Sequence, residues 1–266
     1  MHAVDRSSTL GLTRDERRAW SEDGLFVRPE VFDHAELGAL TAGAEAAAER
    51  AVAGCAGGCT YHLDGKRFVD RGHVTVQFEH APGSTDVKVV EPVHGFDARL
   101  EALIDDVRLT RPIRELLATD ALSLWTDKLN LKRPGVGSGF GWHQDSPYWV
   151  HDHDDVDALP NVMVTFDDAA ADNGALGLIR GSHREGCLPG TADGSQLGGF
   201  YTDPERFDLR AQVVAAVPAG SLIFFSPHLV HGSQPNASQR PRRAMVITYQ
   251  PGHAPTLKSR EIRPIP

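Results

Sequence analysis

The second half of the chain constrains the fold most, because its apolar residues fall into runs too short for helices. Beyond Ala121 these runs are separated by Gly, Pro, Asn and Asp, which are the residues that form turns. In chain order they are ALSLWTDKLNLK, GFGWHQD, VMVTFDD, ALGLIRGS, QVVAAVPAGSLIFF and RRAMVITYQ. Many short strands at such spacing are typical of an antiparallel barrel or jelly roll. We therefore expect a core of this kind over about residues 121–252.

The first half of the chain mixes helical and strand-like patterns. Thr13 and Asp33 each have a glutamate three residues later, which is the capping-box pattern at the start of a helix. The pattern indicates an α+β protein in which about residues 1–120 form a helical layer with some strands. The expected elements are a helix that ends before Gly24, a strand at 25–27, a helix that ends near Gly54, β-rich runs between 62 and 93, and a helical stretch at 100–120.

Composition narrows the class of protein. A chain of 266 residues with 41% hydrophobic positions can bury a sizeable core, and we expect one domain over residues 1–266. A formal net charge of -9 disfavours nucleic acid and anionic membranes as partners. No run approaches the roughly 20 apolar residues of a membrane span, and the start lacks the apolar stretch of a signal peptide. We expect a cytoplasmic protein of unknown oligomeric state, and its odd count of three cysteines gives no disulfide framework.

A candidate metal site begins at His143-Gln-Asp145. On a strand, side chains at positions i and i+2 face the same side, so one metal ion can contact both. A third ligand must come from a distant segment, and His231 follows the apolar run SLIFFSPHLV, which we expect to be a core strand. Two histidines and one carboxylate form the facial set that suits iron(II) and leaves positions open. His228 is the rival to His231, and on a strand the two would face opposite ways.

A basic group follows this third ligand. Arg242 lies 11 residues after His231, and a guanidinium offers two parallel donors to a carboxylate. Ser233 adds a hydroxyl to the same region. The matching ligand would be the distal carboxylate of 2-oxoglutarate, which binds iron through its other end. Arg240 and Arg243 compete with Arg242 for this role, and alternation along a strand puts Arg240 and Arg242 on one face.

Three segments in this order resemble the phytanoyl-CoA dioxygenase superfamily. They are GWHQDSPYW, NGALGLIRGSH and AGSLIFFSPHLVHGSQPNASQRPRRA, and the resemblance covers about residues 12–250. It implies a double-stranded β-helix core, cupin-like, with the helices of the N-terminal half packed on one sheet. It also implies iron(II) bound by His143, Asp145 and His231, and 2-oxoglutarate held by Arg242, with O2 as the oxidant. Relatives that halogenate replace the carboxylate by a small residue, so the retained Asp145 implies hydroxylation.

The same resemblance implies further contacts. An upstream lysine, Lys88, and the strands near Lys128 and Met163 correspond to segments that contact the co-substrate in this family. Met163 departs from the tryptophan that is usual at its position. Tyr148 and Trp149, next to the H-x-D motif, are candidates for the lining of a substrate pocket. The run HDHDDVD at 151–157 is rich in metal-binding residue types, but such crowding in a loop is typical of a solvated segment.

The predicted activity is hydroxylation of an unactivated C–H bond in a small-molecule metabolite, with release of succinate and CO2. Two alternatives stay open. One is a cupin-like metalloenzyme, an isomerase or a dioxygenase, that does not use 2-oxoglutarate, and Arg242 would then have no role. The other is a non-catalytic jelly-roll domain that keeps a metal for structure only. Formation of succinate from 2-oxoglutarate would distinguish the predicted hydroxylase from both of these alternatives.

Overall fold

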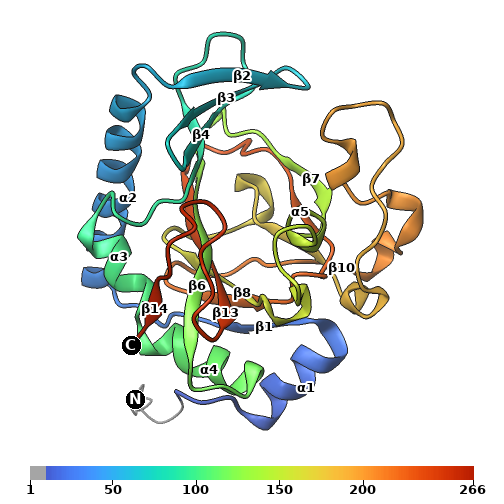
Figure 1. Ribbon diagram of the computed structural model, residues 1–266. Helices are drawn as coiled ribbons and strands as arrows, with labels where there is room; N and C mark the ends of the chain where they lie inside the picture. Colours follow the sequence, from blue (N-terminus) through green and yellow to red (C-terminus); the bar gives the residue numbers. More distant parts are fainter. Residues whose placement is uncertain (1–9) are drawn as a thin grey trace.

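The computed structural model describes residues 10–266, and its strands form two antiparallel sheets (Figure 1). The larger sheet has the order β1-β11-β8-β13-β6-β5-β4-β3-β2, with β14 also paired to β6. Its strands are β1 (Leu25–Arg28), β2 (Cys59–Leu63), β3 (Lys66–Arg71), β4 (Val74–Phe78), β5 (Val87–Glu91), β6 (Leu122–Lys132), β8 (Asn161–Thr165), β11 (Leu222–Phe225), β13 (Arg242–Pro251) and β14 (Pro264–Ile265). The smaller sheet has the order β10-β9-β12-β7, formed by β10 (Gln212–Val214), β9 (Leu176–Ile179), β12 (His231–Ser233) and β7 (Phe140–His143).

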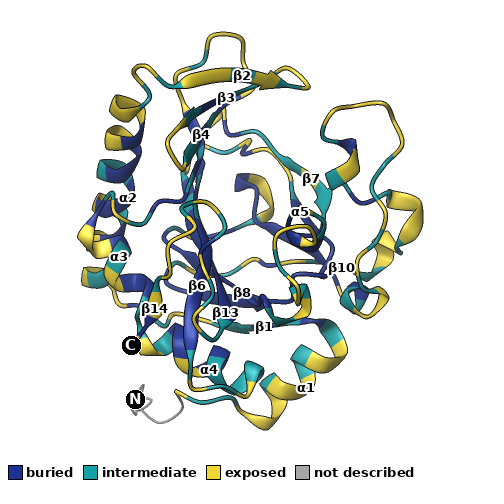
Figure 2. Ribbon diagram, viewed as in Figure 1, coloured by how far each residue is buried: buried dark blue, intermediate teal, exposed yellow. Residues whose placement is uncertain are grey.

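The helices of the N-terminal half lie against the larger sheet, as expected. The α-helices are α1 (Arg14–Asp23), α2 (His34–Gly54), α3 (Ala98–Ile104), α4 (Val107–Leu117) and α5 (Ser146–Trp149). Buried side chains of α2, α3 and α4 join those of β5, β6, β8 and β13 in one apolar cluster. In Figure 2 the ribbons of β6 and β8 are dark blue, which marks buried residues, and yellow, exposed residues lie on the outer helices and loops. The alanines on the buried face of α2 are small, so the helix can approach the sheet closely.

Local capping signals predicted the helix starts. Thr13 and Asp33 are N-caps, and each makes both hydrogen bonds of a capping box with the glutamate three residues on. Gly24 ends α1 with φ +79°, a left-handed conformation that a glycine adopts without strain. The stretch at 100–120 forms two helices instead of one, because Asp106 caps a new helix start. Its side chain accepts a hydrogen bond from the backbone N–H of Arg108.

Three strand predictions need correction near the candidate site. β7 ends at His143, two residues short of the end of the expected run GFGWHQD, and the residues SPYW that follow this run form the short helix α5. The run QVVAAVPAGSLIFF forms two strands, β10 and β11, which belong to different sheets. The run SLIFFSPHLV is not one strand, because β11 ends at Phe225 and a turn through Pro227 follows. His231 therefore begins its own strand, β12, in the smaller sheet.

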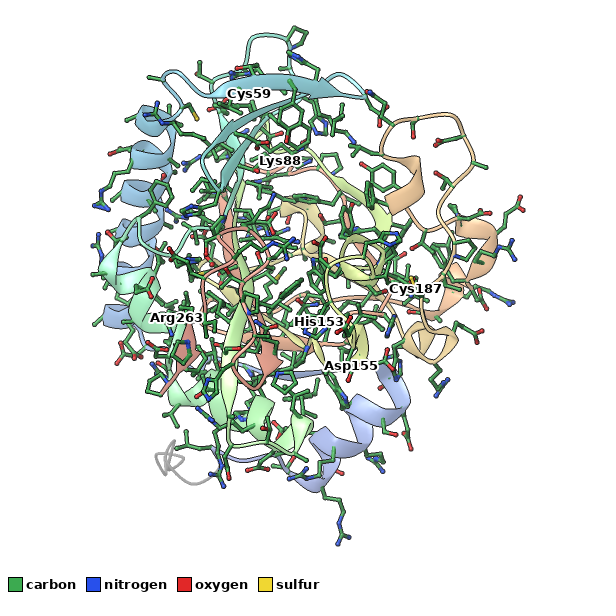
Figure 3. The ribbon with its side chains drawn as sticks, viewed as in Figure 1. Cys59, Lys88, His153, Asp155, Cys187 and Arg263 are labelled. Atoms are coloured by element: carbon green, nitrogen blue, oxygen red, sulfur yellow. The ribbon has the colours of Figure 1, made fainter. Side chains whose placement is uncertain are left out.

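Two observations concern the chain as a whole. Among residues 10–266, no helix is long and apolar enough to cross a bilayer. Cys55, Cys59 and Cys187 are all free thiols, and Figure 3 shows Cys59 and Cys187 in separate parts of the molecule.

Candidate functional site

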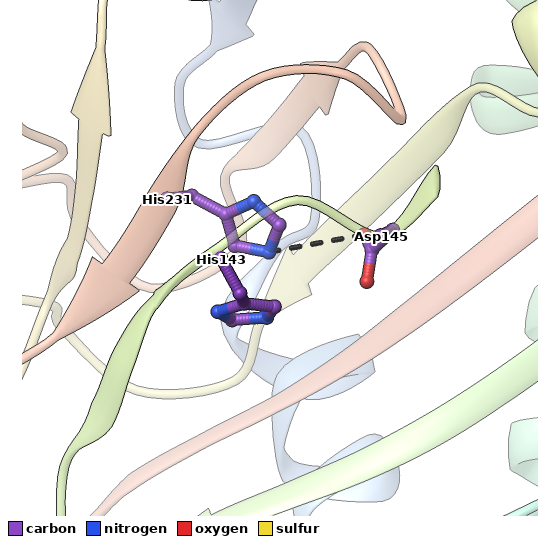
Figure 4. A group of neighbouring side chains, drawn as sticks. All are labelled: His143, Asp145 and His231. Atoms are coloured by element: carbon purple, nitrogen blue, oxygen red, sulfur yellow. Dashed lines mark ion pairs between the residues drawn. The ribbon is translucent and has the colours of Figure 1, made fainter. Parts of the chain in front are cut away.

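The three proposed metal ligands converge at the junction of β7 and β12. His143 and His231 are directly opposite each other in the antiparallel pairing of these strands. Asp145 lies beyond the end of β7 in a helical backbone conformation, so its side chain reaches the same point by a turn and not by strand alternation. Its Oδ2 is 3.8 Å from His231 Nε2 (Figure 4). One ligand atom from each residue lies within 4.8 Å of the others, and in the described part of the chain no other such group occurs.

Both imidazoles are held with one nitrogen free for a metal. His143 Nδ1 is 2.8 Å from the carbonyl oxygen of Gly141, and His231 Nδ1 is 2.8 Å from that of Leu229. A carbonyl can only accept a hydrogen bond, so both Nδ1 atoms carry the proton and donate it. Each Nε2 lone pair is then available, which is the form of histidine that binds a metal. Burial, with His231 nearby, lowers the pKa of His143 to about 3, so this ring stays neutral.

Asp145 is fixed by polar partners behind the ligands. Asn161, the first residue of β8, donates from Nδ2 to Asp145 Oδ2 at 2.9 Å, and Thr248 donates to Asn161 Oδ1 at 2.6 Å. Lys128 Nζ lies 3.7 Å from Asp145 Oδ1. Burial alone would raise the pKa of Asp145, but Lys128, the two histidines and the Asn161 hydrogen bond together outweigh burial, and the pKa is lowered. The carboxylate is therefore anionic and oriented before any metal arrives.

The rival histidine and the acidic loop make other contacts. His228 is buried, with Nδ1 2.9 Å from Ser146 Oγ and Nε2 2.6 Å from Asp157 Oδ1. Asp152 pairs with Arg260 at the surface. These contacts connect the 151–157 loop to its surroundings by hydrogen bonds and an ion pair.

A cavity of about 480 Å³ opens next to the three ligands. Its volume falls within the usual range of about 300–1,000 Å³ for small-molecule sites. The structure brings all the site residues named from the sequence into its lining, and these are Lys88, Lys128, His143, Asp145, Tyr148, Trp149, Met163, His231, Ser233 and Arg242. Phe140, Tyr201, Asn130 and Lys66 join them.

Arg242 lies in this lining with part of its guanidinium unsatisfied. The side chain is 2% exposed, and its Nε and Nη2 donate to the carbonyl of Gly174 at 3.2 and 2.7 Å. Nη1 has no partner, and the buried hydroxyl of Ser233 has none either. A buried donor without an acceptor costs about 1–3 kcal/mol. Two such donors in one cavity therefore fit a carboxylate as the missing acceptor, and the site suits 2-oxoglutarate on this observation.

Gly174 is required at its position for two reasons. Its φ of +80° is one that residues with a side chain rarely adopt. A Cβ there would lie 2.5 Å from the carbonyl oxygen of Gln234 and 2.8 Å from Lys132 Nζ. Glycine thus lets its carbonyl reach Arg242 while Lys132 passes beside it.

Two buried lysines lie near Arg242, and the sequence interpretation missed one of them. Lys132 is directly opposite Arg242 in the pairing of β6 with β13, and its Nζ donates to the carbonyl of Gln234. Burial, with Arg242 and Lys88 nearby, lowers the pKa of Lys132 to about 6. Burial also lowers the pKa of Lys88, which donates to Gly139 at 2.7 Å, to about 8. Figure 3 labels Lys88 near β3 and β4. Three basic groups are therefore crowded at this end of the cavity, and a bound dianion would favour the charged forms of the two lysines.

Other residues of the site were also missed by sequence reasoning. Asn161 carried a weak signal, since it is a polar residue at the start of an otherwise apolar run. Tyr201 carried none: it lies in an irregular segment, and only the structure shows its backbone bridging to His143. Gly141 allows this approach, because a Cβ there would lie 3.0 Å from the Tyr201 ring.

Comparison with known proteins agrees with this geometry. The chain is similar to the L-proline trans-4-hydroxylase of Streptomyces griseoviridis, with 28% identity over 69% of this chain and 77% of that protein. It is also similar to the ectoine dioxygenase of Bordetella bronchiseptica, with 26% identity over 90% of this chain and 75% of the relative. These relatives confirm the predicted enzyme class, an iron(II)- and 2-oxoglutarate-dependent dioxygenase that hydroxylates a small molecule.

Solved structures confirm the predicted fold class, a double-stranded β-helix core with helices packed on one sheet. The crystal structure of EctD from S. alaskensis with 2-oxoglutarate and 5-hydroxyectoine matches with a TM-score of 0.67 at 23% identity, over 94% of this chain and 79% of that one. The carbocyclase SnoK from nogalamycin biosynthesis matches with a TM-score of 0.66 at 18% identity, over 91% and 85%. The model of the phytanoyl-CoA dioxygenase family matches residues 20–244, and the chain belongs to that family.

Proposed function

We propose that His143, Asp145 and His231 of this chain bind iron(II), and that Arg242 and Ser233 hold the distal carboxylate of 2-oxoglutarate. The observation that carries this assignment is the pair of unsatisfied buried donors, Arg242 Nη1 and Ser233 Oγ, in the same cavity as the three ligands. Neither alternative function gives these donors an acceptor. A metal kept for structure, or a cupin without an oxo acid, would leave both of them unpaired.

The protein's own residues hold and orient the reactants. The two histidines and the carboxylate would supply three ligand atoms to iron(II), and this ligand set would leave room for 2-oxoglutarate and O2 at the ion. Bound iron supplies the redox chemistry by which 2-oxoglutarate and O2 become succinate and CO2 and a C–H bond is hydroxylated. Lys88, Lys128 and Met163 form further walls for the co-substrate in this proposal.

Tyr148 and Trp149 line the part of the cavity assigned to the substrate. Tyr148 lies with its ring centroid 6.2 Å from that of His143 and stacks on Phe200 at 4.4 Å. Trp149 is 1% exposed and packs edge-on against Trp125 at 6.5 Å. These aromatic contacts place a rigid apolar wall beside the ligands. Such a wall positions a C–H bond by shape and keeps water from the site.

The proposal treats residues 1–266 as a single oxygenase domain and keeps the cytoplasmic location expected from the sequence. Its helical N-terminal layer covers about residues 1–120 and its jelly-roll core about residues 121–252. Pairing of β1 with β11 and of β5 with β6 supports one domain, because both pairs join the two halves in one sheet.

Succinate formation tests the proposal. Purified protein supplied with iron(II), 2-oxoglutarate and O2 should release succinate slowly without substrate and faster with a suitable small metabolite. Asp145→Ala should abolish both rates because iron binding is lost. His228→Ala, at a buried histidine with other partners, is the matched control and should retain the slow rate. An inactive wild-type protein that binds iron and 2-oxoglutarate normally under all conditions tried would contradict hydroxylation.

A further inference from the structure

All five lysines of the chain gather at the cavity. The sequence contains Lys66, Lys88, Lys128, Lys132 and Lys258, and no others. Four of them line the cavity, and Lys132 lies beside Arg242 of its lining. Lysine is ordinarily a surface residue, and here arginine supplies the other basic positions. The cavity of an acidic protein is therefore basic.

The lining cations outnumber the carboxylates that face them. The carboxylates of the lining are Glu91, Asp145 and Asp152. Asp145 lies between Lys128 and the two histidines, and Asp152 pairs with Arg260. Glu91 accepts a hydrogen bond from Thr126 at 2.9 Å.

Lys66 and Lys258 are left without a carboxylate. Among residues 10–266, no ion pair joins either lysine to an acidic group. Lys258 is exposed, and its Nζ lies 3.3 Å from Thr75 Oγ1. Lys66 is half-buried and is the better placed of the two, because it reaches a residue that adjoins a metal ligand.

Lys66 contacts Tyr201, and Tyr201 adjoins His143. Lys66 Nζ donates to Tyr201 Oη at 2.5 Å, and the same ammonium lies 5.0 Å from the centre of the Tyr201 ring. The backbone of Tyr201 bridges to that of His143. When the tyrosine hydroxyl accepts from Lys66, its own proton remains free to be donated to a ligand. An ammonium and a phenol hydroxyl at one point form a two-donor site for an anion.

We propose that the primary substrate carries an anionic group, a carboxylate or a phosphonate, which Lys66 and Tyr201 bind while its oxidised carbon faces the metal ligands. The proposal rests on the proposed function, because 2-oxoglutarate must occupy Arg242 and the metal. The two carboxylates of 2-oxoglutarate then have their own partners, and Lys66 is left for the other reactant. A cavity of about 480 Å³ that also holds 2-oxoglutarate restricts this reactant to a small metabolite.

Lysine-selective NMR tests this inference without turnover. Protein labelled with carbon-13 at the lysine ε-carbon gives five signals, which Lys→Arg variants assign. Zinc serves as a diamagnetic metal, and the protein is saturated with 2-oxoglutarate before probes are added. We expect methylphosphonate and acetate to shift the Lys66 signal saturably. Acetamide, which has the shape of acetate without its charge, should not shift it.

Variants separate binding from folding. Lys66→Met should weaken methylphosphonate binding about 10- to 100-fold, the usual effect of losing a hydrogen bond to a charged group. Lys66→Arg should restore most of the affinity, and Tyr201→Phe should weaken it less than Lys66→Met does. Lys258→Met is the matched control at the rim and should leave it unchanged. All variants should bind 2-oxoglutarate with the affinity of the wild type, and this unchanged affinity would show that they are folded.

Three results would overturn the inference. They are a Lys66 signal that does not shift when methylphosphonate or acetate is added, a Lys66 signal that shifts equally with acetamide, and a shift of the Lys258 signal alone. Failure of the proposed function looks different. In that case 2-oxoglutarate itself would leave the signals of Lys88 and Lys132 unchanged. If 2-oxoglutarate shifts the signals of Lys88 and Lys132 but the probes do not shift that of Lys66, only the proposal of an anionic substrate is refuted.

Discussion

Replacing Arg242 by methionine tests the assignment of the co-substrate site most directly. The variant keeps an unbranched side chain of similar length in a buried position but removes the guanidinium. Nε and Nη2 are already used by the carbonyl of Gly174, so Nη1 is the nitrogen left for a ligand. One hydrogen bond to a charged group contributes about 1.5–3 kcal/mol. At about 1.4 kcal/mol for each factor of ten, the affinity for 2-oxoglutarate should fall about 10- to 100-fold.

The effect on the free protein should be small, because two changes oppose each other. The variant leaves the Gly174 carbonyl without its donor, which costs about 1–3 kcal/mol. It also removes a buried cation, and burial disfavours that charge enough to lower the pKa of Arg242 to about 10. The midpoint of thermal unfolding without ligand should therefore change little. The stabilisation that 2-oxoglutarate gives to the wild type should be largely lost.

Anaerobic titration of 2-oxoglutarate into the iron(II) protein, followed by the visible absorption of the complex, measures this affinity. Arg240→Met is the matched control, because Arg240 lies two residues earlier, is exposed and pairs with Asp172. It should bind 2-oxoglutarate like the wild type. Equal loss of iron and 2-oxoglutarate binding in Arg242→Met would refute the reasoning, and so would unchanged 2-oxoglutarate affinity.

Three further predictions concern neighbouring groups. Ser233→Ala should weaken 2-oxoglutarate binding about 2- to 10-fold in the same titration, since one neutral hydroxyl contributes about 0.5–1.5 kcal/mol; a larger loss than in Arg242→Met would contradict the assigned roles. Lys132 has a pKa of about 6, below its ordinary value, so it is neutral at pH 7.5, and a bound dianion should raise that pKa. Binding of 2-oxoglutarate at pH 7.5 should therefore be coupled to proton uptake. In isothermal titration calorimetry the binding enthalpy should then depend on the ionisation enthalpy of the buffer, and Lys132→Met should remove that dependence. Asp145→Asn should lower iron affinity while preserving the fold, and equilibrium dialysis that finds wild-type affinity would exclude Asp145 as a ligand.

The parts of the fold that local sequence signals control were predictable. Two capping boxes, a left-handed glycine at the end of α1 and short β-rich runs gave the helix starts and most strands. The break between α3 and α4 was missed, because Asp106 reads as an interior helix position until its capping contact is seen. The end of β7 at His143 was missed for a related reason: Ser146 and Pro147 suit the start of a helix, but the strand pattern before them was stronger.

The sequence predicted that the three candidate ligands lie together, and they do, although strand alternation is not the reason. Asp145 reaches His231 through a turn after the strand, and both histidines depend on backbone carbonyls two residues earlier. Spacing could not show Asn161 holding the carboxylate, because the two residues meet only when β8 packs beside the site. The sequence did not indicate Lys132 as a site residue either, because a lysine at the end of a predicted strand ordinarily faces solvent. Its burial follows from the pairing of β6 with β13 opposite Arg242.

The confinement of lysine to the cavity has a practical consequence for handling the protein. Apart from the α-amino group, every primary amine lies in or beside the site. Coupling to an activated ester or an aldehyde surface would therefore react first at the exposed Lys258 on the rim and obstruct the entrance. Fluorescent labels and solid supports are better attached through the exposed thiols of Cys59 and Cys187, both of which lie outside the cavity lining.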